Sequence, residues 1–257
     1  MKSNFEFKHS IRGVDFQYAC GPIVGEREIH PYHEILYYID GDATLLTEGF
    51  DKKPRQGTVI LIPRESYHFF KCDESDKFRR LKISFTEIVG FEQLSDEIMS
   101  GIRFFENLDS DVIALLDKTC EKMQRGDGSA FSFGALLILL SSLDGDARHI
   151  SQHTRSKSIS AALEYIDAHL TECIDVKTIA ANTGVSSSTL SHTFKREMGI
   201  SLHQYVTQKR MMLARRLIDG GQLPTKIFSN CGFSDYSSFY KAYVAYFGHS
   251  PSKIGHT

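Results

Sequence analysis

Three histidines and a glutamate gather in the N-terminal half of the chain, in a pattern that could bind a metal or a small ligand. His30, His33 and Glu34 fall close together, and His68 follows later. Imidazole and carboxylate groups are common metal ligands. If this run is extended, however, strand alternation sends His30 and His33 to opposite faces, and only an irregular turn at Pro31 would let three ligands converge. We therefore expect no metal and no cofactor.

The same region offers candidates for contact with a small molecule, which are His30, His33, Tyr37 and His68. For each of them, packing in a core or at its rim is the simpler interpretation, and ligand contact is the functional one. The tyrosines and histidines near residues 30–38 suit a sugar, an aromatic compound or a peptide equally well.

A second candidate surface lies near the C-terminus, where two windows, 178–201 and 226–250, repeat one pattern. The matching positions are Ile179, Gly184, Leu190, Phe194 and Gly199 in the first window and Ile227, Gly232, Phe239, Tyr243 and Gly248 in the second. A repeat of this kind predicts a duplicated structural unit. The spacing predicts a helix, a turn closed by a left-handed glycine, and a second helix with one apolar face, which is a helix-turn-helix. Most of the aromatic rings in residues 232–251 are thus expected to be core.

Each second helix leaves a polar face that could contact DNA. After Ser186 as N-cap or near-cap, the first unit exposes Ser187, Ser188, Thr189, Ser191, His192, Lys195 and Arg196. After Ser234 in the same role, the second unit offers Asp235, Tyr236, Ser237, Ser238, Tyr240 and Lys241. Hydroxyls, an imidazole and cations suit a helix that reads base edges and reaches phosphates. One such helix alone is usually just a solvated face, but duplication of the whole unit favours DNA binding.

An amphipathic helix is predicted over residues 201–221, between the two units, and its length would set their separation. Two recognition helices on one side of DNA should lie about 34 Å apart. Arg210 on this helix could contact phosphate, or could pair with an acid such as Asp235 to hold the units together. The structural role is slightly favoured.

The charge distribution agrees with a C-terminal module that meets a polyanion. The 257 residues carry a net charge of −2. From Lys157 onward there are 11 Lys and Arg against 7 Asp and Glu, a charge of +4, which leaves −6 for residues 1–156. We find no signal-peptide pattern at the N-terminus, no apolar run long enough to span a bilayer, and five scattered cysteines. We therefore expect a cytoplasmic protein that does not enter a membrane.

Residues 20–85 alternate short β-rich runs with turns, which predicts an antiparallel sandwich or small barrel. The strands are expected at 34–39, 43–47, 58–62, 66–70 and 78–85. Helices are expected at 88–102, 110–123 and 131–143, where they would pack on the barrel or mediate self-association. A polar segment at 144–158 indicates an interdomain linker.

Residues 158–254 resemble the DNA-binding domain of the AraC/XylS family of bacterial transcription regulators. The resemblance rests on 165–166, 179–186, 190–201, Tyr205 with Arg210 and Ala214, and 232–254. Two departures are Phe228, where the family usually has alanine, and Val244-Ala245, which replaces a common basic pair. Residues 30–41 with 57–70 resemble the cupin barrel that often precedes this domain. The family resemblance also implies a dimer on paired half-sites.

The predicted fold class is α+β, with an N-terminal antiparallel cupin-like β-barrel, following helices, and a C-terminal all-α domain with two helix-turn-helix units. The expected domains are an effector-binding barrel at 1–85, a helical dimerisation or packing region at 86–143, a linker at 144–157 and the DNA-binding domain at 158–257. The predicted function is a sequence-specific DNA-binding transcription regulator controlled by a small molecule, and not an enzyme. Double-stranded DNA, a small-molecule effector, RNA polymerase and a second copy of the chain are the expected partners.

Two alternatives stay open at this point. One is a metal-dependent cupin enzyme with an appended helical domain. The other is a DNA-binding module without any ligand, in which the barrel serves only for assembly.

Overall fold

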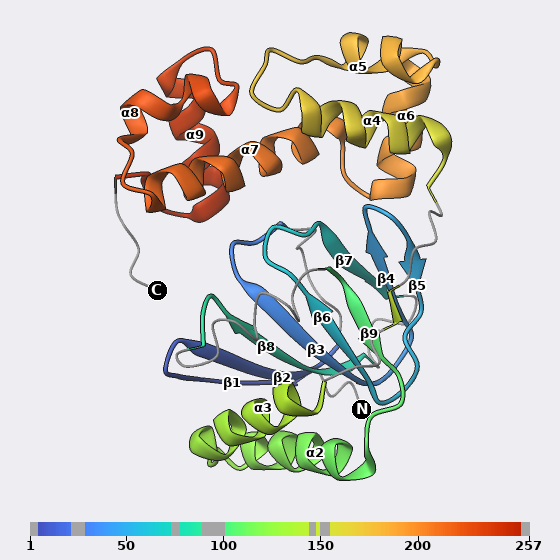
Figure 1. Ribbon diagram of the computed structural model, residues 1–257, viewed down its shortest axis with the longest axis vertical. Coiled ribbons are helices and arrows are strands. Elements are labelled where there is room, and N and C mark those ends of the chain that lie inside the picture. The colour runs from blue at the N-terminus through green and yellow to red at the C-terminus, as the bar shows by residue number, and fades with distance from the viewer. Residues whose placement is uncertain are drawn as a thin grey trace. The chain divides into compact units, whose positions relative to one another are not determined.

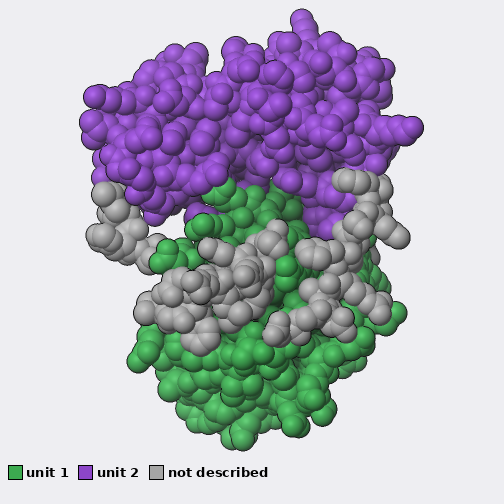
Figure 2. All heavy atoms as spheres, in the orientation of Figure 1, with its two compact units in different colours: residues 1–26, 32–46, 51–151 green, residues 27–31, 47–50, 152–257 purple. Residues whose placement is uncertain are grey.

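The computed structural model describes residues 5–21, 29–72, 78–88, 101–143, 148–149 and 155–252. The chain divides into two compact units, coloured in Figure 2. Unit 1 comprises residues 1–26, 32–46 and 51–151, and unit 2 comprises residues 27–31, 47–50 and 152–257. Within the described ranges, no helix is both long and apolar enough to cross a membrane.

Unit 1 is built on antiparallel strands followed by helices, which confirms the α+β class (Figure 1). The strands are β1 (Phe5–Ile11), β2 (Val14–Cys20), β3 (His33–Asp40), β4 (Ala43–Thr47), β5 (Asp51–Lys52), β6 (Thr58–Ile62), β7 (His68–Cys72), β8 (Arg79–Phe85), β9 (Arg103–Phe105) and β10 (Arg148–His149). They form a seven-stranded sheet in the order β1-β2-β8-β3-β6-β9-β10 and a three-stranded sheet in the order β5-β4-β7. The described strands thus make two separate sheets, and the expected closed barrel is not formed among them.

One face of the seven-stranded sheet is covered by helices α2 (Ser110–Gln124) and α3 (Ser129–Ser142) (Figure 1). In β3, Tyr37 lies opposite Val59 of β6 and Leu81 of β8. All three side chains belong to a core that also contains Leu116 of α2 and Leu136 of α3. Strand alternation therefore points Tyr37 toward the helices and its neighbours Leu36 and Tyr38 toward the opposite face.

Several strands lie where the sequence analysis expected something else. The β1–β2 hairpin was not predicted, although residues 5–11 alternate in burial as a strand should. Strand β9 lies in the region expected to be helical, and β10, which pairs with β9, lies in the expected linker. Strands of two or three residues are too short to show a period, and pairing with a neighbouring strand decides their conformation. Most of the helix expected at 88–102 lies outside the described residues.

Unit 2 contains the helices expected from the repeat. They are α4 (Lys157–Ala168), α5 (Val176–Thr183), α6 (Ser187–Met198), α7 (Leu202–Asp219), α8 (Pro224–Ile227), the 3₁₀ turn η1 (Ser229–Cys231) and α9 (Tyr236–Phe247). Helices α5 and α6 form the first helix-turn-helix, and α8, η1 and α9 form the second. Helix α7 joins them and ends at the cap Gly220, as predicted.

The repeated apolar positions are core in both helix-turn-helix motifs, as predicted. Ile179, Leu190 and Phe194 are fully buried in the first motif. Ile227, Phe239 and Tyr243 are buried at the matching positions of the second motif. Since α6 and α9 both bury residues at i and i+4, each helix must present its opposite side outward.

Candidate functional site

The start of helix α6 is fixed by two local features. Gly184 closes α5 with φ of 72°, a left-handed conformation in which a side chain is disfavoured. Ser186 then caps α6, because its hydroxyl accepts a hydrogen bond from the Thr189 N–H at 3.1 Å. Both roles were predicted. Together they set where α6 begins and which of its residues face outward.

The outward face of α6 is polar and basic. Ser188, Thr189, Ser191, His192, Lys195 and Arg196 are exposed, and Ser187 is half-buried. Arg196 lies 3.3 Å from the carboxylate of its neighbour Glu197. In the described part of the chain, Lys195 has no ion-pair partner. This face can donate hydrogen bonds, and a positive charge at Lys195 is available for a phosphate.

The face of α9 is less available than the sequence indicated. Asp235 is the N-cap, and its carboxylate accepts hydrogen bonds from the Ser238 N–H and hydroxyl, both at 2.8 Å. The Ser238 N–H bond is the main reason that the pKa of Asp235 is lowered. Tyr236 is half-buried, with its ring against Phe228 at 6.2 Å. Asp235, Tyr236 and Ser238 are thus engaged in contacts within this helix-turn-helix, although Asp235 and Ser238 are exposed. Ser237, Tyr240 and Lys241 are exposed as well.

Arg210 on α7 connects the two helix-turn-helix units from within. Its Nε donates to the carbonyl oxygen of Leu170 at 3.0 Å, and a terminal nitrogen donates to that of Glu172 at 2.7 Å. The guanidinium also lies over the ring of Phe233, 5.7 Å from its centre. The suggestion that Arg210 pairs with an acid such as Asp235 was therefore wrong. Two carbonyls after α4 and the turn before α9 hold this side chain.

Arg210 lies tightly against Gly232, at the turn before α9. Gly232 has φ of 76°, and a Cβ added there would lie 2.7 Å from the Arg210 guanidinium. Glycine suits the left-handed backbone at this position, and a side chain here would displace the Arg210 guanidinium. At the equivalent Gly184, with φ of 72°, an added Cβ meets nothing within 4 Å.

The histidine candidates of the N-terminal half do not form one group. Within unit 1, His68 Nε2 lies 3.9 Å from Glu34 Oε1. His33 is separate from them, since its Nδ1 accepts a hydrogen bond from the Arg64 N–H at 3.2 Å.

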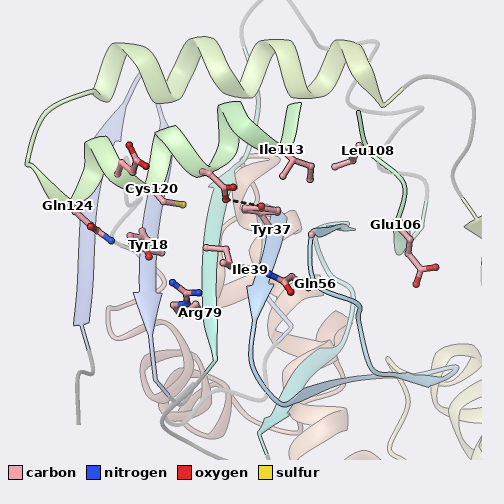
Figure 3. Close-up of a pocket in the computed structure, with 13 residues that line it drawn as sticks. Tyr18, Tyr37, Ile39, Gln56, Arg79, Glu106, Leu108, Ile113, Cys120 and Gln124 are labelled. Carbon is pink, nitrogen blue, oxygen red and sulfur yellow. Dashed lines mark hydrogen bonds between the residues drawn. The ribbon is translucent and has the colours of Figure 1, made fainter. Parts of the chain in front are cut away.

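Tyr37 lies in a cavity of about 610 Å³ between the seven-stranded sheet and α2 (Figure 3). Tyr18, Tyr37, Ile39 and Arg79 line it from the sheet, Gln56, Gly57, Glu106 and Leu108 from loops, and Ile113, Asp117, Cys120, Glu121 and Gln124 from α2. The Tyr37 hydroxyl donates to Asp117 Oδ1 at 2.9 Å, shown by the dashed line in Figure 3. Of the four predicted ligand residues, Tyr37 is the one that lines this cavity.

The comparisons with known proteins agree with the helix-turn-helix geometry. A family model described as a helix-turn-helix domain matches residues 179–256. The probable transcriptional regulator LumQ of Photobacterium leiognathi is 39% identical over 90 residues, which cover 35% of this chain and 36% of LumQ. The Msm operon regulatory protein of Streptococcus mutans is 23% identical, with 93% of this chain and 88% of the relative covered. The transcriptional activator RhaS of Escherichia coli is 22% identical, with 88% and 85% covered.

Residues 179–256 are a helix-turn-helix domain of the AraC type. The departures of this domain from the usual AraC/XylS pattern have a structural account. Phe228, in place of a small alanine, is half-buried, and its ring packs edge-on against Tyr236. Val244 is half-buried and Ala245 is exposed, where the family often carries two cations. The second helix-turn-helix therefore presents less positive charge than the first.

Sequence reasoning missed most of the cavity. Arg79, Asp117, Glu121 and Gln124 come from strand β8 and helix α2, far from Tyr37 in the sequence. No motif links these positions. The one available signal was the pairing pattern of the sheet, which places Arg79 and Tyr37 on neighbouring strands.

Proposed function

We propose that the chain is a sequence-specific DNA-binding transcription regulator whose N-terminal unit binds a small-molecule effector. The observation that carries the proposal is the duplicated helix-turn-helix. Helices α6 and α9 each follow a left-handed glycine, each are capped, and each turn a polar face outward. Helices in this setting enter the major groove, and their side chains contact base edges and phosphates.

The two helices are proposed to contribute unequally. On α6, Ser188, His192 and Lys195 are exposed, and their spacing of i, i+4 and i+7 puts them on one side of the helix. This helix would therefore supply base contacts and phosphate affinity. On α9, Ser237, Tyr240 and Lys241 remain, with one cation among them. We infer that α9 contributes fewer phosphate contacts and therefore less of the salt-dependent affinity.

Several finer parts of the proposal follow from the family and from the site. The regulator would act in the cytoplasm on double-stranded DNA, as a homodimer on paired half-sites and in contact with RNA polymerase. Its sensor would lie within residues 1–85 with the helices at 86–143, and the DNA-binding domain at 158–257. Effector occupancy would change how the DNA-binding domains are held. No catalysis is required.

The alternative of a metal-dependent enzyme rests on Glu34 and His68, whose Oε1 and Nε2 atoms lie 3.9 Å apart in unit 1. It requires a stoichiometric metal in the purified protein, lost on changing Glu34→Gln. Elemental analysis of the full chain, with and without this substitution, measures the bound metal. DNA binding by α6 does not require a metal, so the regulator is compatible with a metal-free protein and the enzyme is not.

Selection of DNA from a random pool by the full-length protein tests the proposed function. We expect enrichment of one sequence. His192→Ala should relax the preference at the base pairs that it contacts, while Lys195→Ala should weaken binding to every sequence by a similar factor. If the pool yields no enriched sequence, the chain is not a sequence-specific regulator.

A further inference from the structure

Two charged side chains that line the cavity between the sheet and α2 are each neutralised by a partner of opposite charge. Arg79 donates from Nε to Asp40 Oδ1 at 2.7 Å and from a terminal nitrogen to Asp40 Oδ2. Glu106, on the opposite side, lies 2.7 Å from Lys52 Nζ. Neither Arg79 nor Glu106 therefore brings uncompensated charge into the cavity. An anionic ligand would have to compete with Asp40 for the Arg79 guanidinium.

Two carboxylates on α2 have no cation paired with them among the residues that the structure describes. Asp117 and Glu121 lie one turn apart on the side of α2 that lines the cavity. Asp117 accepts a hydrogen bond from Tyr37, and across the described residues no Lys or Arg pairs with either carboxylate. The nearest cations on the same helix, Lys118 and Lys122, lie over the Phe131 ring of α3, at 5.8 and 5.4 Å. The uncompensated charge of the cavity is therefore negative.

The floor of the cavity is aromatic. Tyr18 and Tyr37 project from neighbouring parts of the sheet toward α2, and both are almost fully buried (Figure 3). Burial, followed by the hydrogen bond with Asp117, raises the pKa of Tyr37, so its hydroxyl stays a donor. The Tyr37 hydroxyl thereby orients one oxygen of Asp117 and leaves the other free to accept. Ile39, Leu108 and Ile113 add apolar surface around the rings.

We propose that this cavity is the effector site and that it takes a small organic cation. An ammonium group would bind the carboxylates of Asp117 and Glu121, while the apolar part of the ligand lies against Tyr18 and Tyr37. Aromatic faces attract cations as well as apolar groups. The volume of about 610 Å³ lies within the range of ligand pockets. That the bound cation is a regulatory effector rests on the proposed function; the binding itself does not.

The test uses three compounds that share one frame and differ in charge, titrated calorimetrically into the full-length protein. They are 2-phenylethylamine (a cation), 2-phenylethanol (neutral) and 3-phenylpropionate (an anion). We expect the amine to bind at least about tenfold more tightly than the alcohol, since hydrogen bonds to charged groups are the stronger ones. We expect no binding of the carboxylate.

Three variants on α2 place the binding in the cavity. Asp117→Asn and Glu121→Gln should each weaken the amine about tenfold or more, because each removes one negative charge from the lining. Asp111→Asn is the matched control, since Asp111 is an exposed carboxylate on the same helix outside the cavity. It should leave the affinity unchanged. All three positions are exposed, so circular dichroism should show intact folding.

Three outcomes would overturn the inference: none of the compounds binds, the alcohol or the carboxylate binds as well as the amine, or the amine binds both cavity variants unchanged. DNA binding is measured on the same preparations. Intact DNA binding without amine binding overturns the cavity inference alone, whereas loss of sequence-specific DNA binding in the unaltered protein overturns the proposed function, whatever the amine does.

Discussion

Gly232→Ala is expected to destabilise the C-terminal unit by about 3 kcal/mol. A side chain in the left-handed region costs about 1–2 kcal/mol on its own. The new Cβ would also lie 2.7 Å from the Arg210 guanidinium, so Arg210 must move away from the carbonyls of Leu170 and Glu172. Loss of hydrogen bonds from a charged donor adds about 1–2 kcal/mol. Urea unfolding of the full chain, followed by far-UV circular dichroism, measures the change.

Gly184→Ala is the matched control, because Gly184 has the equivalent position in the first helix-turn-helix. It has almost the same left-handed φ, and its added Cβ meets nothing within 4 Å. We expect only the backbone cost of about 1–2 kcal/mol at this position. Equal losses for the two variants would show that the contact between Gly232 and Arg210 contributes nothing.

Arg210→Met is expected to destabilise the protein by about 2 kcal/mol. Methionine keeps an unbranched side chain in this place, but it removes the guanidinium that lies over Phe233 and leaves the carbonyls of Leu170 and Glu172 without their donor. Since the site is half-buried, water replaces part of the lost bonding. Lys195→Met, at an exposed position of α6, should change stability by less than about 0.5 kcal/mol.

The double variant Gly232→Ala/Arg210→Met gives a sharper test of the same contact. Once the guanidinium is gone, the alanine at 232 no longer displaces it, so the two losses should not add. We expect the double variant to be about 1–2 kcal/mol more stable than the sum of the single changes predicts. Strict additivity would mean that Arg210 and Gly232 act independently.

The C-terminal unit was largely predictable because its determinants are local. Gly184 and Gly232 close turns, Ser186 caps a helix, and Leu190 with Phe194 repeats at helical spacing. Each of these signals lies within a few residues of the structure that it sets. The duplication then showed that the pattern was not accidental.

The partner of Arg210 and the role of Asp235 were not predictable in the same way. Arg210 bonds to backbone carbonyls about forty positions earlier in the chain, and carbonyls carry no sequence signature. Asp235 was expected as a DNA contact and Ser234 as the cap or near-cap, whereas the Ser238 N–H donates to Asp235, which is the N-cap. Long-range packing, which no spacing encodes, decides the partners of Arg210, while the cap at Asp235 is a local choice between two adjacent residues.

The N-terminal unit illustrates the same limit. The alternation of residues 33–40 predicted β3, but it did not indicate that α2 would cover the face that carries Tyr37. The histidines attracted attention because of their chemistry, while Asp117 and Glu121 looked like ordinary polar residues of an amphipathic helix. The cavity exists only after the helix has packed on the sheet.

The most direct test of the account is the salt dependence of DNA binding by the full-length protein. We expect affinity for the selected DNA to fall steeply as salt rises. Lys195→Ala/Arg196→Ala should reduce the slope of log K against log salt by about 1.8, close to 0.9 for each lost phosphate contact. Lys118→Ala/Lys122→Ala on α2 is the matched control and should leave the slope unchanged. A slope near zero, or one unaffected by the loss of Lys195 and Arg196, would contradict the assignment of α6 as a DNA-reading helix.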